Sequence, residues 1–427
     1  MNKIILMKNI FKQIISDFHA KPIRTIKGRD LQIEMNTSKI ISIIWPRRSG
    51  KSYYLFGVIE ELLSLWVDKT RIVYINFEDE RIDIDGNNLG LLIDAYLELY
   101  NAQDLKDVYF FFDEIQNIDN WEKFVRRLYD DGSTHIFITG SNAKLLSKEI
   151  STSLRGRSIS YELLPLSFRE FLAFKDQKIN IHVTKDRAKL LSLQKEFIEW
   201  GWFPEVSEMN EELKIKTLQE YFDVMLYNDI VERYKIKDVV LLKQFVKLLL
   251  QTTTKDFSIN KIGNDLQSMG FHFDKNILYE FLDHLDTIYF GKSVSKFDHS
   301  FKKQTLKKFY LIDNGFLNAL TFKFSDNYGK LLENTVFTEL YRRHGEDIYF
   351  LRNGSETDFV INNEQKLIYQ VCYDLNPENR DREIRGCLDA MEKFWVVSSM
   401  IVTFKQEENI NIDGKNIEVL PFYKVFL

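Results

Sequence analysis

Residues 40–52 read IISIIWPRRSGKS, a short apolar run that leads directly into Gly-Lys-Ser at positions 50–52. A buried strand, then Gly-x-x-x-x-Gly-Lys-Ser/Thr, then a helix is the pattern of a phosphate-binding loop. Trp45 stands where this pattern has its first glycine. Residues 53–66 carry apolar side chains at helical spacing, so the loop is expected at a helix N-terminus, where backbone N–H groups and the helix dipole attract phosphate.

The loop predicts a site for ATP or GTP. Lys51 is expected to reach the β- and γ-phosphates, and the Ser52 hydroxyl to bind Mg²⁺. The remaining residues expected to bind the nucleotide are Pro46, Arg47, Arg48, Ser49 and Gly50. A tryptophan in place of the first glycine must point away from the nucleotide or narrow its site, because glycine alone turns there without a Cβ. The alternative is a basic turn between a strand and a helix.

A second pattern reads VYFFFDE at residues 108–114. Five apolar residues followed by two carboxylates form the Walker B arrangement of a nucleotide-binding sheet. Asp113 is expected to hold Mg²⁺ through water, and Glu114 to orient or deprotonate the attacking water. A strand that ends in a solvated acidic turn is the alternative. The two patterns occur in the expected order, roughly 60 residues apart, and together indicate an ATP site.

Two further segments offer candidates for hydrolysis. The apolar strand expected at residues 135–139 is followed by Ser141 and Asn142, which could contact the γ-phosphate or the attacking water, or could instead cap a helix. Residues 154–157 read LRGR, and Arg157 could reach the nucleotide of a neighbouring subunit and neutralise developing charge. The alternative is a pair of surface arginines beside a turn glycine.

Composition limits the classes of protein. A chain of 427 residues with 44% hydrophobic and 28% charged residues is typical of a soluble protein of about two or three domains. No apolar run approaches the ~18–20 residues of a membrane span, so a cytoplasmic protein without membrane contact is expected. Two cysteines, Cys372 and Cys387, imply neither a disulfide framework nor a metal site. The net charge of −5 argues against a protein that coats nucleic acid, although a local basic face is compatible with it.

The chain is expected to hold four segments. Residues 1–180 alternate strand and helix patterns, which predicts an α/β P-loop NTPase core with a parallel sheet and its ligand at the carboxyl ends of the strands. Residues 181–240 are expected to form a helical lid or linker. Within it Asp229 and Arg233 stand four apart, which favours an intrahelical salt bridge over a nucleotide-sensing arginine.

Residues 241–325 hold 12 lysines, no arginine and 8 acidic residues, a balance of +4. A helix, a second helix and a hairpin are expected, an order that resembles a winged helix. The hairpin lysines expected to meet the phosphates of DNA are Lys302, Lys303, Lys307 and Lys308. A solvated hairpin in a protein-interaction module is an equal alternative.

Residues 326–427 are expected to form a last α/β domain. Glu333 on a helix and Asp358 on a strand occupy two places of a restriction-nuclease-like site, which uses clustered carboxylates for Mg²⁺ and a lysine for charge stabilisation. The remaining places hold Gln370 and Cys372, a weak metal ligand and an uncharged side chain. The domain is therefore predicted to keep the fold for docking without nuclease activity.

The ordered stretches PRRSGKS, FFFDEIQNIDNWEKFVRRLYDDG, FITGSNAKLLS, LRGR and LPLSFREF resemble the prokaryotic AAA-type ATPases with an AAA_14-like domain and a DUF4143 C-terminal region. WGWFPEV, YLIDNGF and ENTVFTELYRRHGEDIYFLRN extend the resemblance through the C-terminal half. It implies an ATPase domain, a winged-helix segment and a nuclease-like fold. The matching positions are Gly50, Lys51 and Ser52 for phosphate and Mg²⁺, Asp113 and Glu114 for Walker B, Ser141 or Asn142 as sensor, and Arg157 as finger.

The favoured hypothesis is an ATPase that couples its nucleotide state to a nucleic acid, a protein partner or further copies of itself. Two alternatives remain open. One is an ATP-binding interaction module with negligible turnover, motivated by Trp45. The other is an ATP-dependent DNA-processing nuclease, which Gln370 and Cys372 disfavour.

Overall fold

The computed structural model of the chain describes residues 3–23, 26–44, 48–101, 103–140, 152–177, 179, 183–298, 306–321 and 328–427. The chain divides into two compact units, Met1–Leu164 and Pro165–Leu427, and each is described by itself. The first unit ends before the predicted boundary at residue 180. The finer division into four segments remains a prediction.

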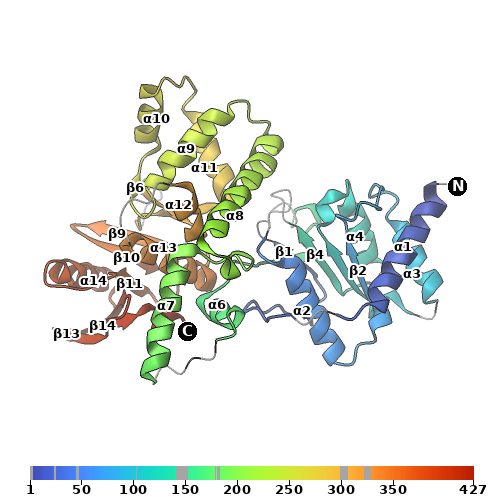
Figure 1. Cartoon of the computed structure of the whole chain (residues 1–427), viewed down its shortest axis with the longest axis horizontal. Coiled ribbons are helices and arrows are strands. Elements are labelled where there is room, and N and C mark those ends of the chain that lie inside the picture. The colour runs from blue at the N-terminus through green and yellow to red at the C-terminus, as the bar shows by residue number, and fades with distance from the viewer. Residues whose placement is uncertain are drawn as a thin grey trace. The chain divides into compact units, whose positions relative to one another are not determined.

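A parallel sheet of five strands forms the centre of unit 1, in the order β2-β3-β4-β1-β5. The strands are β1 (Ile40–Ile44), β2 (Ile72–Asn76), β3 (Tyr109–Asp113), β4 (Ile136–Gly140) and β5 (Ser158–Glu162). Of these, β1, β3 and β4 match the expected segments. Because the strands are parallel, the ends of β1, β3 and β4 lie at one edge of the sheet, with β4 between the other two (Figure 1).

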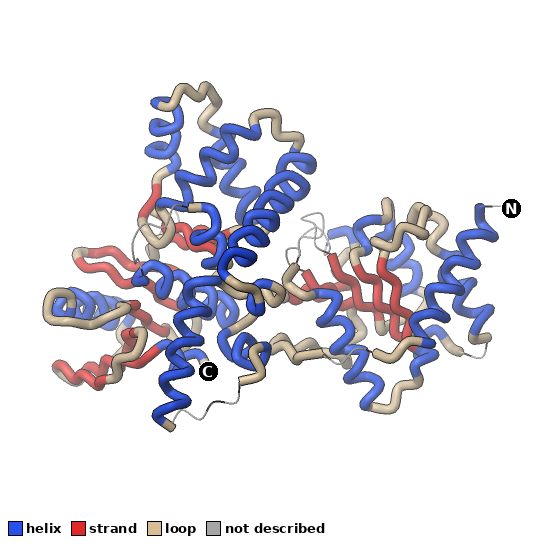
Figure 2. Tube along the Cα trace, viewed as in Figure 1, coloured by secondary structure: helices blue, strands red, loops and turns tan. Residues whose placement is uncertain are grey.

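Helices cover both faces of this sheet (Figure 2). They are α1 (Lys3–Ala20), α2 (Lys51–Ser64), α3 (Gly90–Leu99) and α4 (Trp121–Asp130). One face packs α1, α3 and α4 around Phe110 and Phe112. On the other face, Phe56 of α2 lies 4.8 Å from the ring of Tyr74 on β2, measured between ring centroids. Burial on both faces explains why these strands read as nearly continuous apolar runs.

Unit 2 begins with helices. They are α6 (Phe168–Phe174), α7 (Thr184–Trp200), α8 (Glu211–Val224), which continues as a π-helix over Met225–Glu232, and α9 (Val239–Gln251). The LPLSFRE stretch starts α6 through a capping box, in which Ser167 Oγ accepts from Glu170 N and the Glu170 carboxylate accepts from Ser167 N. Asp229 lies in the π-helix, and Arg233 stands in the short α-helical stretch that follows it.

A small antiparallel sheet follows, in the order β6-β8-β7. The elements of this middle module are α9, β6 (Asp256–Phe257), α10 (Ile259–Ser268), α11 (Asn276–Thr287), β7 (Gly291–Ser295) and β8 (Lys307–Leu311). The expected hairpin is therefore present as β7 and β8. Gly291 is needed at its start because a Cβ there would lie 2.4 Å from the Phe309 ring.

A mixed sheet of six strands completes unit 2, in the order β13-β14-β12-β11-β10-β9. Its strands are β9 (Ile348–Asn353), β10 (Ser355–Ile361), β11 (Leu367–Val371), β12 (Ser398–Thr403), β13 (Glu408–Ile412) and β14 (Lys415–Pro421). The helices of this part are α12 (Asn314–Leu320), α13 (Tyr328–His344), α14 (Arg380–Phe394) and α15 (Phe422–Phe426). Among the described residues of the whole chain, no helix has the length and apolar character that a membrane span requires.

Candidate functional site

The predicted phosphate loop joins β1 to α2. Gly50 caps α2 at its N-terminus in the left-handed conformation, with φ 91° and ψ 28°, a backbone state that glycine adopts without steric cost. Arg48 also has a positive φ of 72°. Lys51 then opens the helix and is 4% exposed. Trp45, Pro46 and Arg47 lie outside the described residues, so their predicted places in the loop are untested.

The hydrogen bonding of the Ser49 hydroxyl indicates whether the loop suits an anion. Its side chain is fully buried, and among the described residues its Oγ has no hydrogen-bond partner. Its carbonyl accepts from Arg29 Nη1 at 2.9 Å, which anchors the loop from behind. A buried hydroxyl without a partner is costly. A phosphate oxygen beside Gly50 and Lys51 would satisfy this hydroxyl, so the loop fits the group that the sequence predicts.

Asp113 lies at the end of β3 and is fully buried. Two hydroxyl groups hold its carboxylate. Thr139 Oγ1, from the neighbouring strand β4, donates to Asp113 Oδ1, and Tyr74 Oη, from β2, donates to Asp113 Oδ2 at 2.7 Å. Burial and the adjacent Asp113 carboxylate raise the pKa of Tyr74 far above its usual range, so this hydroxyl stays a donor.

Glu114 follows Asp113 in a left-handed backbone conformation, with φ 52°. Its backbone N–H donates to Thr139 Oγ1 at 3.0 Å, which secures this turn. Its two carboxylate oxygens have different partners. Oε1 lies 3.8 Å from Lys51 Nζ, and Oε2 accepts from Gln116 Nε2 at 2.5 Å. The phosphate loop and the acidic strand end therefore meet in one place.

Thr139 is the residue that connects these groups, and the sequence analysis did not select it. Its hydroxyl accepts from the Glu114 backbone and donates to the Asp113 side chain. Ser141 and Asn142, the residues predicted for this position, lie outside the described residues. The sequence did contain a feature that could have identified Thr139: it is a hydroxyl residue near the end of the strand next to β3. Neighbouring parallel strands end at the same edge of the sheet, so this hydroxyl lies near Asp113.

Arg157 does not lie beside Lys51, Asp113 and Glu114. It lies just before β5, at the edge of the sheet opposite the end of β3, where its carbonyl accepts from Ile40 N at 2.9 Å. Its guanidinium donates to both oxygens of Asp130, at 3.0 and 3.2 Å. A role toward a neighbouring subunit remains a prediction.

The YLIDNGF stretch of unit 2 meets the WGWFPEV stretch and α13 in a buried polar joint. Its buried polar side chains are Asp313 and Asn314 of YLIDNGF and Asn334 and Thr335 of α13. Asp313 caps α12 by accepting from Gly315 N at 2.7 Å and also accepts from Trp202 N at 2.6 Å. Asn314 Nδ2 donates to the carbonyls of Ile198 and Leu331 and to Thr335 Oγ1. The joint therefore ties α7, α12 and α13 together.

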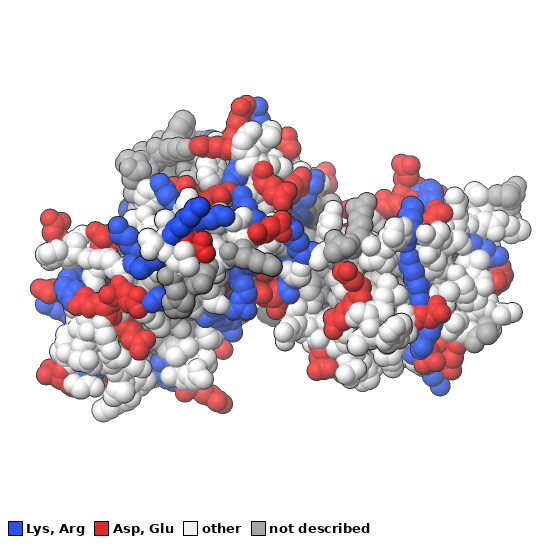
Figure 3. Space-filling view, turned by 60° about the horizontal axis from the view of Figure 1, so that its bottom comes forward, with Lys and Arg blue, Asp and Glu red and all other residues white. Residues whose placement is uncertain are grey.

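Of the hairpin lysines expected to meet DNA, Lys308 does not lie on the surface. Lys308 is 2% exposed, so its predicted contact with DNA phosphates is wrong; the strand turns this side chain into unit 2, where carboxylates surround it. Lys302 and Lys303 lie outside the described residues. On the face drawn in Figure 3, basic and acidic side chains are mixed over both units.

Comparison with known proteins identifies the class of unit 1. Residues 37–172 match a family model described as an AAA domain, and residues 191–327 match one described as a domain of unknown function, DUF8612. The chain thus contains an AAA-type, P-loop ATPase-like fold, as the sequence indicated. The DUF4143 label that the resemblance implied for the C-terminal region is not shown; the second matching model is DUF8612.

The chain belongs to the same family as the uncharacterized protein MJ1544 of Methanocaldococcus jannaschii. The two are 39% identical over 99% of this chain and 96% of that protein. An uncharacterized protein of Haemophilus influenzae is 32% identical over 90% of this chain and 92% of its own length. Among solved structures, the Walker-type ATPase PABY2304 of Pyrococcus abyssi aligns with a TM-score of 0.43 and 12% identity, over 74% of this chain and 95% of that one.

Proposed function

We propose that the chain binds ATP with Mg²⁺ in unit 1 and hydrolyses it. The observation that carries this proposal is the Thr139 hydroxyl, which joins the Asp113 side chain to the Glu114 backbone at the edge of the sheet where Lys51 lies. A lysine at a helix N-terminus beside two acidic residues supplies the charges that phosphoryl transfer to water requires.

Each residue has a proposed task. Lys51, with the backbone around Gly50, would hold the phosphates, and the Ser49 hydroxyl would gain its missing partner. Asp113 and Ser52 would hold Mg²⁺, which when bound neutralises phosphate charge. Glu114 would accept the proton of the attacking water. Phosphates at Lys51 would compete with Glu114 Oε1, which now lies 3.8 Å from Lys51 Nζ. Nucleotide binding would in this way release the carboxylate for its task.

Single-turnover hydrolysis of ATP tests the proposal. We expect Glu114→Gln to lower the rate by roughly 10²–10⁴-fold, the range typical of a lost general base. Binding of a fluorescent ATP analogue should persist in this variant and be lost in Lys51→Ala. Background rates in both the wild type and Glu114→Gln would contradict hydrolysis.

A second candidate is an ATP-binding module with negligible turnover. It is favoured by the engagement of both Glu114 oxygens, one by Gln116 and one near Lys51. The same single-turnover experiment decides, because this module would bind ATP tightly and hydrolyse it at the background rate. Trp45→Gly tests the loop itself, since a large gain in affinity would show that the tryptophan impairs it.

We further propose that unit 2 transmits the nucleotide state to a partner. The order helix, strand, helix, helix, strand, strand over α9 to β8, with β8 in the middle of its sheet, supports a winged-helix-like module. The burial of Lys308 favours a protein partner over DNA. ATP hydrolysis measured with duplex DNA, RNA and co-purified proteins tests this, and stimulation by DNA alone would favour the nucleic acid.

A further inference from the structure

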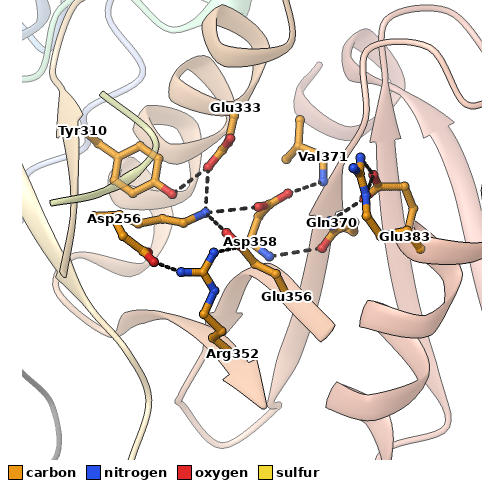
Figure 4. A network of polar contacts seen from close by, with 11 residues as sticks. Asp256, Tyr310, Glu333, Arg352, Glu356, Asp358, Gln370, Val371 and Glu383 are labelled. Atoms are coloured by element: carbon orange, nitrogen blue, oxygen red, sulfur yellow. Dashed lines mark hydrogen bonds and ion pairs between the residues drawn. The ribbon is translucent and has the colours of Figure 1, made fainter. Parts of the chain in front are cut away.

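A single ammonium group lies at the centre of the carboxylates of the C-terminal α/β module, the part of unit 2 from α13 to α15. Lys308 Nζ is 2.6 Å from Glu356 Oε1, 3.2 Å from Glu333 Oε1 and 3.3 Å from Asp358 Oδ1. Figure 4 shows Glu333, Glu356 and Asp358 pointing toward one another from α13 and β10. Lys308 comes from β8 of the middle module.

Further donors also contact the three acidic side chains of this carboxylate cluster. Tyr310 Oη donates to Glu333 Oε1 at 2.8 Å. Val371 N donates to Asp358 Oδ2 at 3.0 Å, and Arg352 Nη2 donates to Glu356 Oε2 at 2.7 Å. An ammonium has three N–H donors, and here three carboxylates surround it. Groups of the chain itself thus contact five of the six oxygens of the cluster.

The distances within the cluster are those of an ammonium paired with carboxylates. Oxygen ligands lie 2.0–2.1 Å from Mg²⁺ and 2.3–2.6 Å from Ca²⁺, whereas the oxygens here lie 2.6–3.3 Å from the nitrogen. Within the described ranges, no three His, Cys, Asp or Glu side chains are arranged to hold a metal. Burial alone would lower the pKa of Lys308, but Tyr310 and the carboxylates raise it well above its usual value, which keeps the lysine charged.

The two residues that replace nuclease positions have structural tasks. Gln370 Oε1 accepts from Asp358 N at 3.1 Å, and its Nε2 donates to Glu383 Oε2 at 2.5 Å. Cys372 Sγ donates to the Asp374 carbonyl at 3.4 Å, and burial raises the pKa of this thiol to about 12. Gln370 thus links the backbone of Asp358 to Glu383 on α14, and neither Gln370 nor Cys372 supplies a cation to the cluster.

We propose that the carboxylate cluster is a cation site whose permanent cation is Lys308, so that the C-terminal module binds no catalytic metal and is fastened to the middle module. The Arg352 guanidinium reinforces the attachment by pairing with Asp256 on β6. The middle sheet is thereby held at two of its strands, β6 and β8. Unit 2 would respond to a partner as one body. This inference does not depend on the ATPase proposal.

The first test asks whether the wild type takes a metal at this place. Nucleotide-free wild type and Asp358→Asn are titrated with Mn²⁺, followed by electron paramagnetic resonance. We expect the same binding curve for both proteins and no Mn²⁺-dependent cleavage of DNA by either. A Mn²⁺ site in the wild type that Asp358→Asn removes would overturn the proposal.

The second test replaces the lysine by a free ammonium ion. In Lys308→Ala, ethylammonium at about 0.1 M should raise the Tm of unit 2 by roughly 3 °C more than tetramethylammonium at the same ionic strength, because only ethylammonium donates hydrogen bonds. The wild type and Lys308→Ala/Asp358→Asn should show no such difference. An equal response of Lys308→Ala to both ions would overturn the proposal, and if this variant fails to fold, the Mn²⁺ experiment decides alone.

Discussion

Gly201 lies so close to Asp313 that a Cβ added to the glycine would come within 1.7 Å of Asp313 Oδ1. The same carboxylate accepts from the next backbone N–H, that of Trp202. The stretches WGWFPEV and YLIDNGF lie more than 100 residues apart in the sequence. The buried Asp313 side chain joins them, and it fits because Gly201 has no side chain. This explains why a glycine is required at this position.

We expect Gly201→Ala to destabilise unit 2 by more than ~3 kcal/mol, since it combines a clash with a backbone state that only glycine adopts readily. Gly201 has φ 80° and ψ −163°. Gly270→Ala is the matched control: its φ is 91°, but no atom lies within 4 Å of the added Cβ. Backbone strain alone should cost this control about 1–2 kcal/mol. Urea denaturation followed by tryptophan fluorescence measures both, and equal losses would show that the contact with Asp313 is unimportant.

The protonation of Asp313 gives a prediction with a defined sign. Burial raises its pKa to about 7, against backbone hydrogen bonds that lower it, and no charged side chain contributes. Because the folded pKa exceeds the unfolded value of about 3.9, the folded state binds more protons between these values. The contribution of Asp313 to stability is therefore complete below pH 4 and is lost as the pH rises through 7.

Asp313→Asn removes this titration and leaves every other group in place. The free energy of unfolding of the wild type, relative to Asp313→Asn, should fall between pH 4 and 7 by at most about 1.4 kcal/mol per pH unit. Urea denaturation at four pH values measures the difference. A relative stability that rises with pH would mean that the backbone donors keep Asp313 ionised in the folded state.

Substitution of Asn314 should destabilise unit 2 by more than the loss of a buried side chain alone would. Asn314→Leu removes the side-chain donor to the Ile198 carbonyl, one of two side-chain donors to the Leu331 carbonyl, and the acceptor of Asn334 Nδ2. We expect a loss of about 3 kcal/mol from unsatisfied buried groups. Asn318→Leu is the control, because Asn318 lies half-buried on the same helix and donates to the single carbonyl of Glu199. It should cost under ~1 kcal/mol, and the thermal unfolding of both variants provides the comparison.

Local patterns in the sequence predicted much of unit 1. The run of buried residues in β3 and the glycine at the start of α2 follow from burial and backbone geometry, which neighbouring residues determine. The lateral order of the strands does not follow from such local properties. Apolar runs of similar length do not reveal which strand lies between β1 and β3. Thr139 was missed for another reason: the prediction chose the polar residues that follow this strand, Ser141 and Asn142, whereas Thr139 lies within β4 itself.

Lys308 shows more clearly what local sequence patterns cannot predict. A lysine-rich hairpin predicts exposed charge, since an isolated buried lysine is costly. The structure buries this lysine because Glu333, Glu356 and Asp358, 25 to 50 residues further along the chain, neutralise it. The sequence analysis placed Glu333 and Asp358 in a nuclease-like site, which remains a prediction; the structure shows that both contact Lys308. No local pattern in the sequence indicated that the cation between these carboxylates is Lys308.

Thr139 provides the strongest test of the proposed ATPase. Thr139→Val keeps the shape of the side chain but removes both hydrogen bonds, so Asp113 loses a donor and the Glu114 backbone loses its acceptor. We expect hydrolysis to fall by roughly 10²-fold, because a catalytic carboxylate displaced by about 1 Å loses much of its effect. Affinity for the ATP analogue should change only a few-fold, since Lys51 and the helix N-terminus are untouched.

Thr139→Ser separates the hydroxyl from the methyl group. The serine can repeat both hydrogen bonds, so its hydrolysis rate should lie within about threefold of the wild type, whereas a role based on packing alone would make serine and valine similarly defective or reverse their order. The pattern of a low rate in valine and a nearly normal rate in serine, with ATP binding retained in both, requires the hydroxyl to position the acidic pair. Loss of ATP binding in Thr139→Val would instead place Thr139 among the residues that build the loop.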